Sequence, residues 1–389
     1  MQIQESPSGA VSLVALPTQP HGVAWPGPRP SDWPTGPIPS GVDASRVNEL
    51  LDQAFGSNPD PAFGESFATL IVQGGRIVAE RYGPGTGPDT PHLSWSMAKS
   101  ITHALVGILA ADGVLDLEAS APVPEWADPT DPRHEITLDQ MLRMGDGLDF
   151  CESYALPATA AITGDTGPTD AVPVEVPFSH CIDMLFGTGA GDHAGYAASR
   201  PLAHTPGSVF NYSSGTANIV ARIVCDVVSD EVLAGSQSAA RSEAARSWMR
   251  EHLFDPIGMT SADPSFDAAG NFVGSSYLHA TARDYARFGL LYLRGGQWDG
   301  RQILPRDWTD YARRPRGVDD DGNAYGSHWW VDEDGRGTFR ASGYEWQRVM
   351  CVPATDLVIV RLGKTLEVNY DTPATWMKAL IAEFDPLRI

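Results

Sequence analysis

Lysine is scarce in this chain of 389 residues, with Lys99, Lys364 and Lys378 as the only three. The remaining positive charge is arginine, and 27 basic residues against 49 acidic ones leave a formal net charge of −22. A chain this acidic repels phosphate backbones and anionic membrane surfaces. The composition therefore argues against a nucleic acid or a membrane as partner, and a small molecule is the expected one.

Cysteine is also rare, and none of the four stands in a C-x-x-C pair. We expect reduced, buried thiols in a reducing compartment. The opening stretch MQIQESPSGAVSLVALP has no basic region, and its short apolar run ends at a proline. It predicts neither a secretory signal nor a membrane span, so a cytoplasmic location is expected.

Several catalytic and metal-binding patterns are missing. No G-x-S-x-G is present, which excludes the nucleophile elbow of α/β-hydrolases. His134-Glu135 has no second histidine four residues on, so the zinc-protease pattern fails, and the ten histidines show no ligand spacing. The segment DDDGNAYG lacks the distant glutamate of a calcium loop. We therefore expect no metal and no cofactor.

The N-terminal part divides into a leader and the beginning of a folded domain. Residues 1–42 are rich in proline and form no periodic pattern, which predicts an extended leader lying on the body through Trp25 and Trp33. The segment FATLIVQGGRIVAERYG (67–83) places two β-rich runs around Gly74-Gly75. This pattern predicts a hairpin.

Helices and strands then follow in blocks. Apolar residues at helical spacing predict helices over 43–54, 96–112, 136–144, 213–228, 280–296 and 372–384. Residues 151–211 are mostly irregular. Near the end of the chain, QRVMCVP and DLVIVRLG are typical of strands joined by a turn.

These blocks predict an α/β (α+β) fold with one folded domain over 43–389. Its antiparallel sheet would be built from N- and C-terminal strands flanked by helices, in a lobe formed by 43–114 and 276–389. A mainly helical lobe, 115–275, would be inserted between the two halves.

The stretch HLSWSMAKSITHALVGILAADGVLDL (92–117) contains the strongest chemical signal. Ser96 opens an apolar helix, near free N–H groups and the positive end of the helix dipole, and Lys99 lies one turn further on. Burial lowers the pKa of a lysine, and a neutral amine can remove a serine proton. A capping serine followed by a solvated lysine would give the same spacing.

Tyr212 lies between a turn and the next apolar helix, in the segment Tyr212-Ser213-Ser214. Its hydroxyl could point at Ser96 and Lys99 and share acid and base duty. The alternative is a core tyrosine bonded to a carbonyl.

Together these motifs resemble the serine β-lactamase and DD-peptidase superfamily, in its class C and esterase branch. The resemblance covers about residues 43–385 and includes the hairpin, SMAKS, LRMGDGLDF (142–150), RPLAHTPGSVFNYSSGTANIVARI, ATARDYARFG and the terminal strands. Within the branch the chain is most similar to the 6-aminohexanoate-dimer hydrolases, which are nylon-oligomer amidases.

The resemblance implies a role for each matching residue. Ser96 would be the acylated nucleophile, Lys99 its base and Tyr212 the proton relay to the leaving group. The segment ASGYEWQ matches the third motif, so the N–H groups of Ser96 and Tyr344 would form the oxyanion hole. The other residues implied at the substrate are Tyr154, Glu152, Trp330, Ser214 and Gly343.

Two departures from the family pattern bear on the substrate. Ser214 stands where the second motif has asparagine, and the third motif lacks its lysine, which would be expected to hold a β-lactam carboxylate. The resemblance thus implies a serine hydrolase that acts on small linear amides or esters through an acyl-enzyme. A carboxylesterase or acyltransferase without amidase activity, a non-catalytic binding module and a homodimer remain open.

Overall fold

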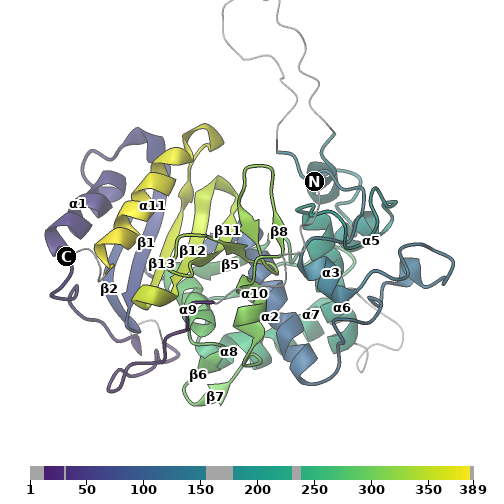
Figure 1. The fold of residues 1–389 in the computed structure, drawn as a ribbon, viewed down its shortest axis with the longest axis horizontal. Helices are drawn as coiled ribbons and strands as arrows, with labels where there is room; N and C mark the ends of the chain where they lie inside the picture. Colours follow the sequence, from purple (N-terminus) through teal and green to yellow (C-terminus); the bar gives the residue numbers. More distant parts are fainter. Residues whose placement is uncertain (1–12, 30–31, 155–177, 230–237, 386–389) are drawn as a thin grey trace, which may run out of the picture.

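The computed structural model describes residues 13–29, 32–154, 178–229 and 238–385 (Figure 1). Its main sheet has eight strands in the order β2-β1-β13-β12-β11-β10-β9-β8, and every neighbouring pair is antiparallel. The strands are β1 (Glu65–Gln73), β2 (Arg76–Tyr82), β8 (Gly317–Val318), β9 (Ala324–Tyr325), β10 (Trp330–Val331), β11 (Phe339–Gly343), β12 (Gln347–Val352) and β13 (Leu357–Lys364).

Strands from both ends of the chain meet in the middle of this sheet. β1 pairs with β13 from Glu65 opposite Lys364 to Gln73 opposite Leu357. The predicted hairpin is formed by β1 and β2, and Gly74 and Gly75 both have positive φ at its turn. The predicted sheet of N- and C-terminal strands is therefore confirmed.

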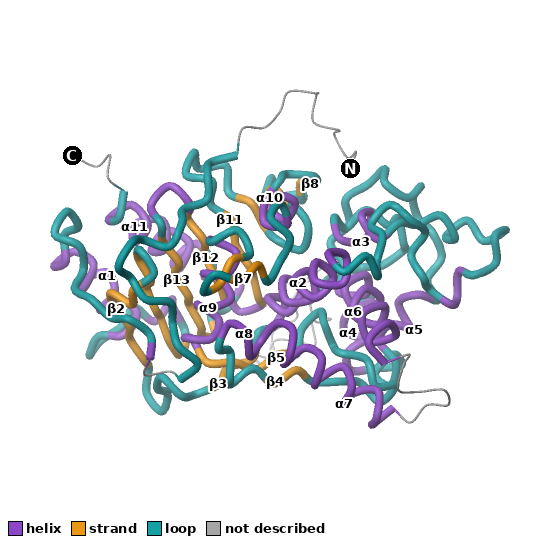
Figure 2. Tube along the Cα trace, turned by 90° about the horizontal axis from the view of Figure 1, so that it is seen from below, coloured by secondary structure: helices purple, strands orange, loops and turns teal. Residues whose placement is uncertain are grey.

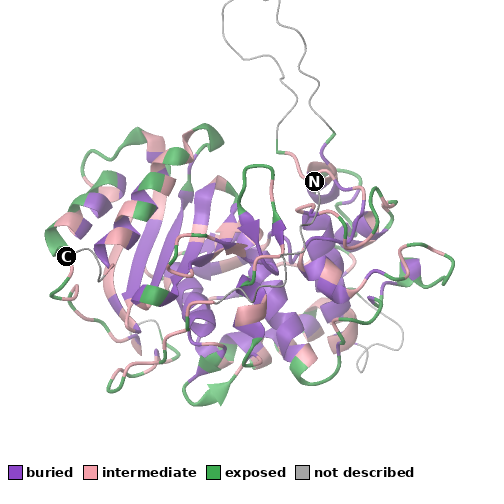
Figure 3. Ribbon diagram, in the orientation of Figure 1, coloured by how far each residue is buried: buried purple, intermediate pink, exposed green. Residues whose placement is uncertain are grey.

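Helices cover both faces of the sheet (Figures 1 and 3). Successive side chains of a strand point to opposite faces, so one strand can contribute to two core clusters. Leu70 and Val72 of β1 join the larger core cluster, which includes helices α2 (Ala98–Ala111) and α9 (Ala282–Leu293). Ile71, between them, joins a second cluster with α1 (Ala44–Phe55) and α11 (Asp371–Glu383). All four helices were predicted, and Asp43 caps the first of them.

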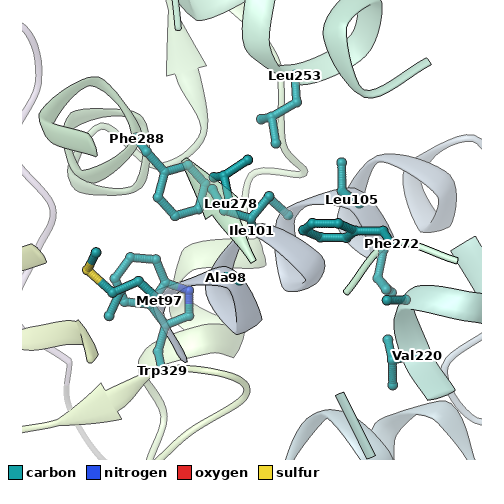
Figure 4. Packing of buried hydrophobic residues seen from close by; sticks show 14 of the residues in the cluster. Met97, Ala98, Ile101, Leu105, Val220, Leu253, Phe272, Leu278, Phe288 and Trp329 are labelled. Atoms are coloured by element: carbon teal, nitrogen blue, oxygen red, sulfur yellow. The ribbon is translucent and has the colours of Figure 1, made fainter. Parts of the chain in front are cut away.

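Helix α2 runs through the centre of the molecule. Every residue from Ala98 to Leu109 is buried, so the helix is surrounded by other elements on all sides. Figure 4 shows Ile101 and Leu105 of α2 among aromatic and aliphatic side chains that include Phe272 and Phe288. The residues in the first turn of α2 are therefore held in place by the surrounding core.

The remaining helices gather beside α2, opposite the sheet (Figures 1 and 2). They are α3 (Leu138–Leu142), α4 (His180–Phe186), α5 (His193–Ala198), α6 (Ser214–Ser229) and α7 (Ser238–Met249), while α8 (Asp255–Ile257) lies beside α9 and α10 (Trp308–Arg313) lies nearer the sheet. Short strands complete the structure: β3 (Pro91–Leu93), β4 (Asp263–Pro264) and β5 (Leu278–Thr281) in one small sheet, and β6 (Gln297–Trp298) with β7 (Arg301–Gln302).

Residues 151–211 were expected to be mostly irregular. In the described part of this segment, the prediction missed two short helices. Helices α4 and α5 form there, each begun by a side-chain cap, from Ser179 and Asp192 respectively. With seven and six residues, they are too short for an apolar period to stand out in the sequence. Residues 155–177 of this segment lie outside the described part.

The described part of the leader contacts the body at both Trp25 and Trp33, as predicted. Trp33 is buried, and its indole N–H donates to the Gly75 carbonyl at 3.0 Å. The rings of Trp25 and Trp298 lie 5.2 Å apart. The leader therefore closes over the hairpin turn and the β6–β7 hairpin.

All four cysteines, Cys151, Cys181, Cys225 and Cys351, are free. In the described ranges, no helix is both long enough and apolar enough to cross a membrane.

Because His328 is buried, we expect the fold to lose stability in acid. Its Nδ1 lies 2.9 Å from the Lys99 carbonyl, and burial lowers its pKa to about 3. An unfolded chain binds a proton at this residue below about pH 6.5, whereas the folded one does not until far lower. Stability is therefore lost as the pH falls from about 6.5 toward 3, by about 1.4 kcal/mol per pH unit from this residue.

We predict that His328→Asn makes the unfolding free energy less dependent on pH between 6.5 and 4.5. Asparagine tolerates the left-handed backbone of this residue (φ 53°) and keeps an N–H donor. Urea unfolding at several pH values measures the slope, and the exposed His21→Asn is the control. Equal slopes in wild type and His328→Asn would contradict the prediction.

Candidate active site

Ser96 lies in a short 3₁₀ turn, Trp95–Met97, that leads directly into α2. Trp95 has a positive φ of 44°, which a non-glycine residue adopts only when its surroundings hold it. The preceding residue supplies that hold: Ser94 Oγ donates to the Ser276 carbonyl at 3.0 Å and accepts from the N–H of Leu278 at 3.1 Å. The turn thus presents Ser96 at a fixed position.

The Lys99 amine is buried and contacts the Ser96 hydroxyl. The residue is 1% exposed, and Nζ lies 2.9 Å from Ser96 Oγ, 2.9 Å from Ser214 Oγ and 3.2 Å from the Ser275 carbonyl oxygen. None of the ion pairs between described residues joins Lys99 to a carboxylate. The solvated lysine that the sequence left open is therefore not what the structure shows.

These three contacts suit a neutral amine as well as a charged one. A neutral lysine has two hydrogens and one lone pair. In the neutral form, Ser214 Oγ and the Ser275 carbonyl can accept the two hydrogens, and the lone pair is then available to the Ser96 hydroxyl. The geometry therefore allows Lys99 to take the proton of Ser96 without rearrangement.

Glu152 lies behind this contact and orients Ser214. One carboxylate oxygen accepts from the backbone N–H of Ser214 at 2.7 Å, and the other accepts from its hydroxyl at 2.6 Å. Because Ser214 donates its hydroxyl proton to Glu152, its oxygen is free to accept from Lys99. Tyr154 donates its own hydroxyl to Glu152. The carboxylate is thus engaged inside the protein.

Tyr212 meets Lys99 with the face of its ring. Nζ lies 4.8 Å from the ring centroid, which is within the range of a cation–π contact. None of the hydrogen bonds between described side chains joins the Tyr212 hydroxyl to Ser96 or Lys99. The expected direction of that hydroxyl therefore stays a prediction.

The third motif lies against the Ser96 turn from the opposite side. A Cβ added to Gly343, at the end of β11, would come within 2.5 Å of the Ser94 carbonyl and 3.3 Å of Trp95 Cβ. Only glycine allows so close an approach. The backbone of Tyr344, the next residue, therefore follows directly on a segment that contacts the turn carrying Ser96.

A pocket of about 1420 Å³ opens over these groups. Its wall near Ser96 is aromatic: the Tyr154 and Tyr344 rings lie 5.2 Å apart, and Trp95 packs edge-on against Tyr344 at 5.7 Å. Trp330 also lines the pocket, whereas Trp329 is fully buried in the core. The other lining residues near the site are Glu152, Tyr212, Ser342, Gly343, Arg340 and Arg348.

The structure thus gathers every residue that the sequence analysis placed at the site. Lys99 and Ser214 form the buried side of the site, and the rest reach the pocket. Sequence reasoning missed Ser275, which contacts Lys99 through its backbone carbonyl, a group that no side-chain pattern identifies. Within the described part, no group of three or more metal-ligating side chains is present.

A family model described as Beta-lactamase matches residues 63–383 of this chain. The chain therefore belongs to the β-lactamase family and is a serine hydrolase of that family. Its sequence is 25% identical over 313 residues to a 6-aminohexanoate-dimer hydrolase of Paenarthrobacter ureafaciens, which covers 76% of this chain and 72% of that protein.

Solved structures share the fold. A Bacillus anthracis protein provisionally named a 6-aminohexanoate-dimer hydrolase is 23% identical, with a TM-score of 0.67 and coverage of 91% of this chain and 88% of that one. A family VIII carboxylesterase is 14% identical, with a TM-score of 0.61 and coverage of 90% and 99%. At these identities the likeness establishes the antiparallel sheet and helical region, and no more.

We predict that Glu152→Gln slows the reaction of Ser96 with a fluorophosphonate probe by roughly ten- to hundredfold. The change removes a charge-assisted hydrogen bond, worth about 1.5–3 kcal/mol, that orients Ser214 against Lys99. Intact-protein mass spectrometry follows the labelling. Glu333→Gln is the control, because Glu333 is an exposed carboxylate of the same pocket. Equal labelling rates in both variants would refute the role of Glu152.

Proposed function

We propose that this protein hydrolyses small linear amides or carboxylic esters through an acyl-enzyme on Ser96. The observation that carries the proposal is the 2.9 Å contact between the Ser96 hydroxyl and a buried amine whose other two contacts are acceptors. Such an arrangement activates a hydroxyl that is a weak nucleophile on its own.

The reaction would proceed in two halves. Ser96 Oγ attacks the carbonyl carbon while its proton passes to the Lys99 amine, and a tetrahedral oxyanion forms. Collapse of this intermediate breaks the bond to the leaving group, which takes up a proton as it departs. Water then attacks the acyl-enzyme ester, the carboxylic acid is released, and Ser96 recovers its proton.

Two groups would stabilise the charges that develop. The N–H groups of Ser96 and Tyr344 face the oxyanion, and donors fixed in place before reaction are most effective there. The protonated Lys99 is stabilised by the Tyr212 ring and, through Ser214, by Glu152. Charge separation is thus supported on both sides of the attacking oxygen.

The substrate assignment rests on the pocket and the relatives. A pocket of about 1420 Å³ is larger than most drug-sized sites and suits an extended chain. The absent third-motif lysine disfavours β-lactams, and the curated relative bears the name of a linear-amide hydrolase. The four free thiols agree with the cytoplasmic location that we keep as part of the proposal.

We predict that Ser96→Ala lowers kcat/KM for p-nitrophenyl acetate by roughly a thousandfold or more, because the nucleophile is lost. Release of p-nitrophenolate measures the rate. Ser208→Ala, which makes the same chemical change at an exposed position, should keep full activity. Full activity of Ser96→Ala would end the proposal, and failure of a fluorophosphonate to label wild-type Ser96 would favour a non-catalytic binding module.

Tyr154→Phe separates an amidase from an esterase. An amide nitrogen must be protonated to leave, whereas a phenolate leaves without help. We predict a loss of roughly tenfold or more in kcat/KM for acetyl-p-nitroanilide and a much smaller loss for p-nitrophenyl acetate. Tyr277→Phe removes the hydroxyl of another nearby tyrosine, whose ring lies 6.2 Å from that of Trp95, and serves as control. Equal losses on both substrates would count against the amidase.

A further inference from the structure

The turn that carries the Tyr344 N–H has a strained backbone. It joins β11 to β12, and two consecutive non-glycine residues within it, Glu345 and Trp346, have positive φ angles of 60° and 63°. Side chains of this kind disfavour the left-handed region, so the conformation persists only if surrounding groups enforce it.

Buried polar groups enforce it on one side. The Glu345 N–H donates to the Tyr370 hydroxyl at 2.9 Å. The Glu345 carbonyl accepts from Arg361 at 3.0 Å and from the Thr365 N–H at 3.1 Å, and the Trp346 carbonyl accepts from the same guanidinium at 3.1 Å. Arg361 is itself 1% exposed, so this contact is part of the core.

Arg348 closes the turn from the pocket side. Its Nη1 donates to the carbonyls of Gly343 and Gln347, both at 2.9 Å, and therefore bridges the two ends of the turn. The guanidinium lies over the Trp346 ring, 4.6 Å from its centroid. Among the ion pairs of described residues, none joins Arg348 to a carboxylate.

The contact between Arg348 and Gly343 bears on the proposed chemistry because it involves the peptide group that carries the Tyr344 N–H. The carbonyl of Gly343 and the N–H of Tyr344 belong to one peptide unit. A cation on the carbonyl oxygen polarises the whole amide and makes its N–H a stronger hydrogen-bond donor. The same contact fixes the plane of the peptide, and with it the direction of the N–H.

We propose that Arg348 is a positioning residue of this hydrolase, whose guanidinium orients and polarises the Gly343–Tyr344 peptide for the oxyanion hole. The inference rests on the proposed function of Ser96 and adds a group that acts without touching the reacting atoms. Arg348 acts on this peptide through the Gly343 carbonyl oxygen, at the opposite end of the amide from the Tyr344 N–H.

Arg348 is charged under working conditions, in crowded surroundings. Burial lowers its pKa to about 10, so the guanidinium stays protonated near pH 7. Burial lowers the pKa of Arg340 and of Arg361, and the nearby charge of Arg348 lowers both further. Three neighbouring guanidinium groups repel one another, which is unfavourable for stability. A role in positioning the turn would explain why an arginine is present at residue 348.

Arg340 offers a matched control. It lies on β11 and lines the same pocket, but its ion-pair partner is Asp332. None of the hydrogen bonds of the Tyr344–Trp346 turn involves it. Arg340→Met therefore removes a positive charge from the pocket and leaves the contacts of the turn in place.

The experiment compares Arg348→Met, Arg348→Lys and Arg340→Met with wild type on p-nitrophenyl acetate. We expect Arg348→Met to lower kcat roughly tenfold with little change in KM, since it weakens a transition-state donor without removing it. Affinity for phenylboronic acid, which forms a tetrahedral adduct with the serine, should fall by a similar factor. Arg348→Lys should recover part of both, and Arg340→Met should stay within about threefold of wild type.

Thermal melts and near-ultraviolet circular dichroism establish that each variant is folded. Unchanged kcat and boronate affinity in folded Arg348→Met would overturn the inference, and so would equal losses in Arg348→Met and Arg340→Met, which would assign the effect to pocket charge. If wild type shows no Ser96-dependent hydrolysis, the proposed function fails and this inference with it. If wild type hydrolyses the ester through Ser96 and the folded Arg348 variants are as active as wild type, the proposed function stands and this inference alone fails.

Discussion

The contact between the Lys99 amine and the Ser96 hydroxyl is the interaction on which the rest of the site depends. A buried amine is costly unless its hydrogens find acceptors, and here Ser214 and the Ser275 carbonyl supply them. Both acceptors are uncharged, so no ion pair locks the amine in its protonated form. Glu152 influences the amine through one hydroxyl, which leaves proton transfer to Ser96 open.

The scaffold makes this contact rigid because three parts of the chain meet at the start of one buried helix. Helix α2 is buried along most of its length and carries Lys99, and the turn that leads into it carries Ser96. The first residue of α6 is Ser214, and the end of β11 approaches so closely that only Gly343 fits. The helical region thus contributes Ser214, the sheet contributes Gly343 and the central helix contributes Lys99, and the pocket opens where these three parts meet.

The sequence predicted the sheet, the main helices and the serine–lysine pair because each rests on a local pattern. Glu152 was placed at the substrate, whereas its carboxylate is bonded to Ser214 and Tyr154, so the structure favours an orienting role. Ser275 and Arg348 were not foreseen, since one acts through a backbone carbonyl and the other through a neighbouring strand. Neither kind of contact leaves a spacing that a single sequence can reveal.

The sequence by itself determined the hairpin, the C-terminal strands, the longer helices and the one-turn spacing of Ser96 and Lys99, because backbone periodicity depends on residues close in the chain. Only the tertiary structure decided what surrounds that pair. The partners of Lys99 lie 115 and 176 residues further along the chain, and Gly343 reaches Ser94 from a different strand. Contacts over such separations form when the core packs, and they give the hydroxyl its neighbours and its proposed chemistry.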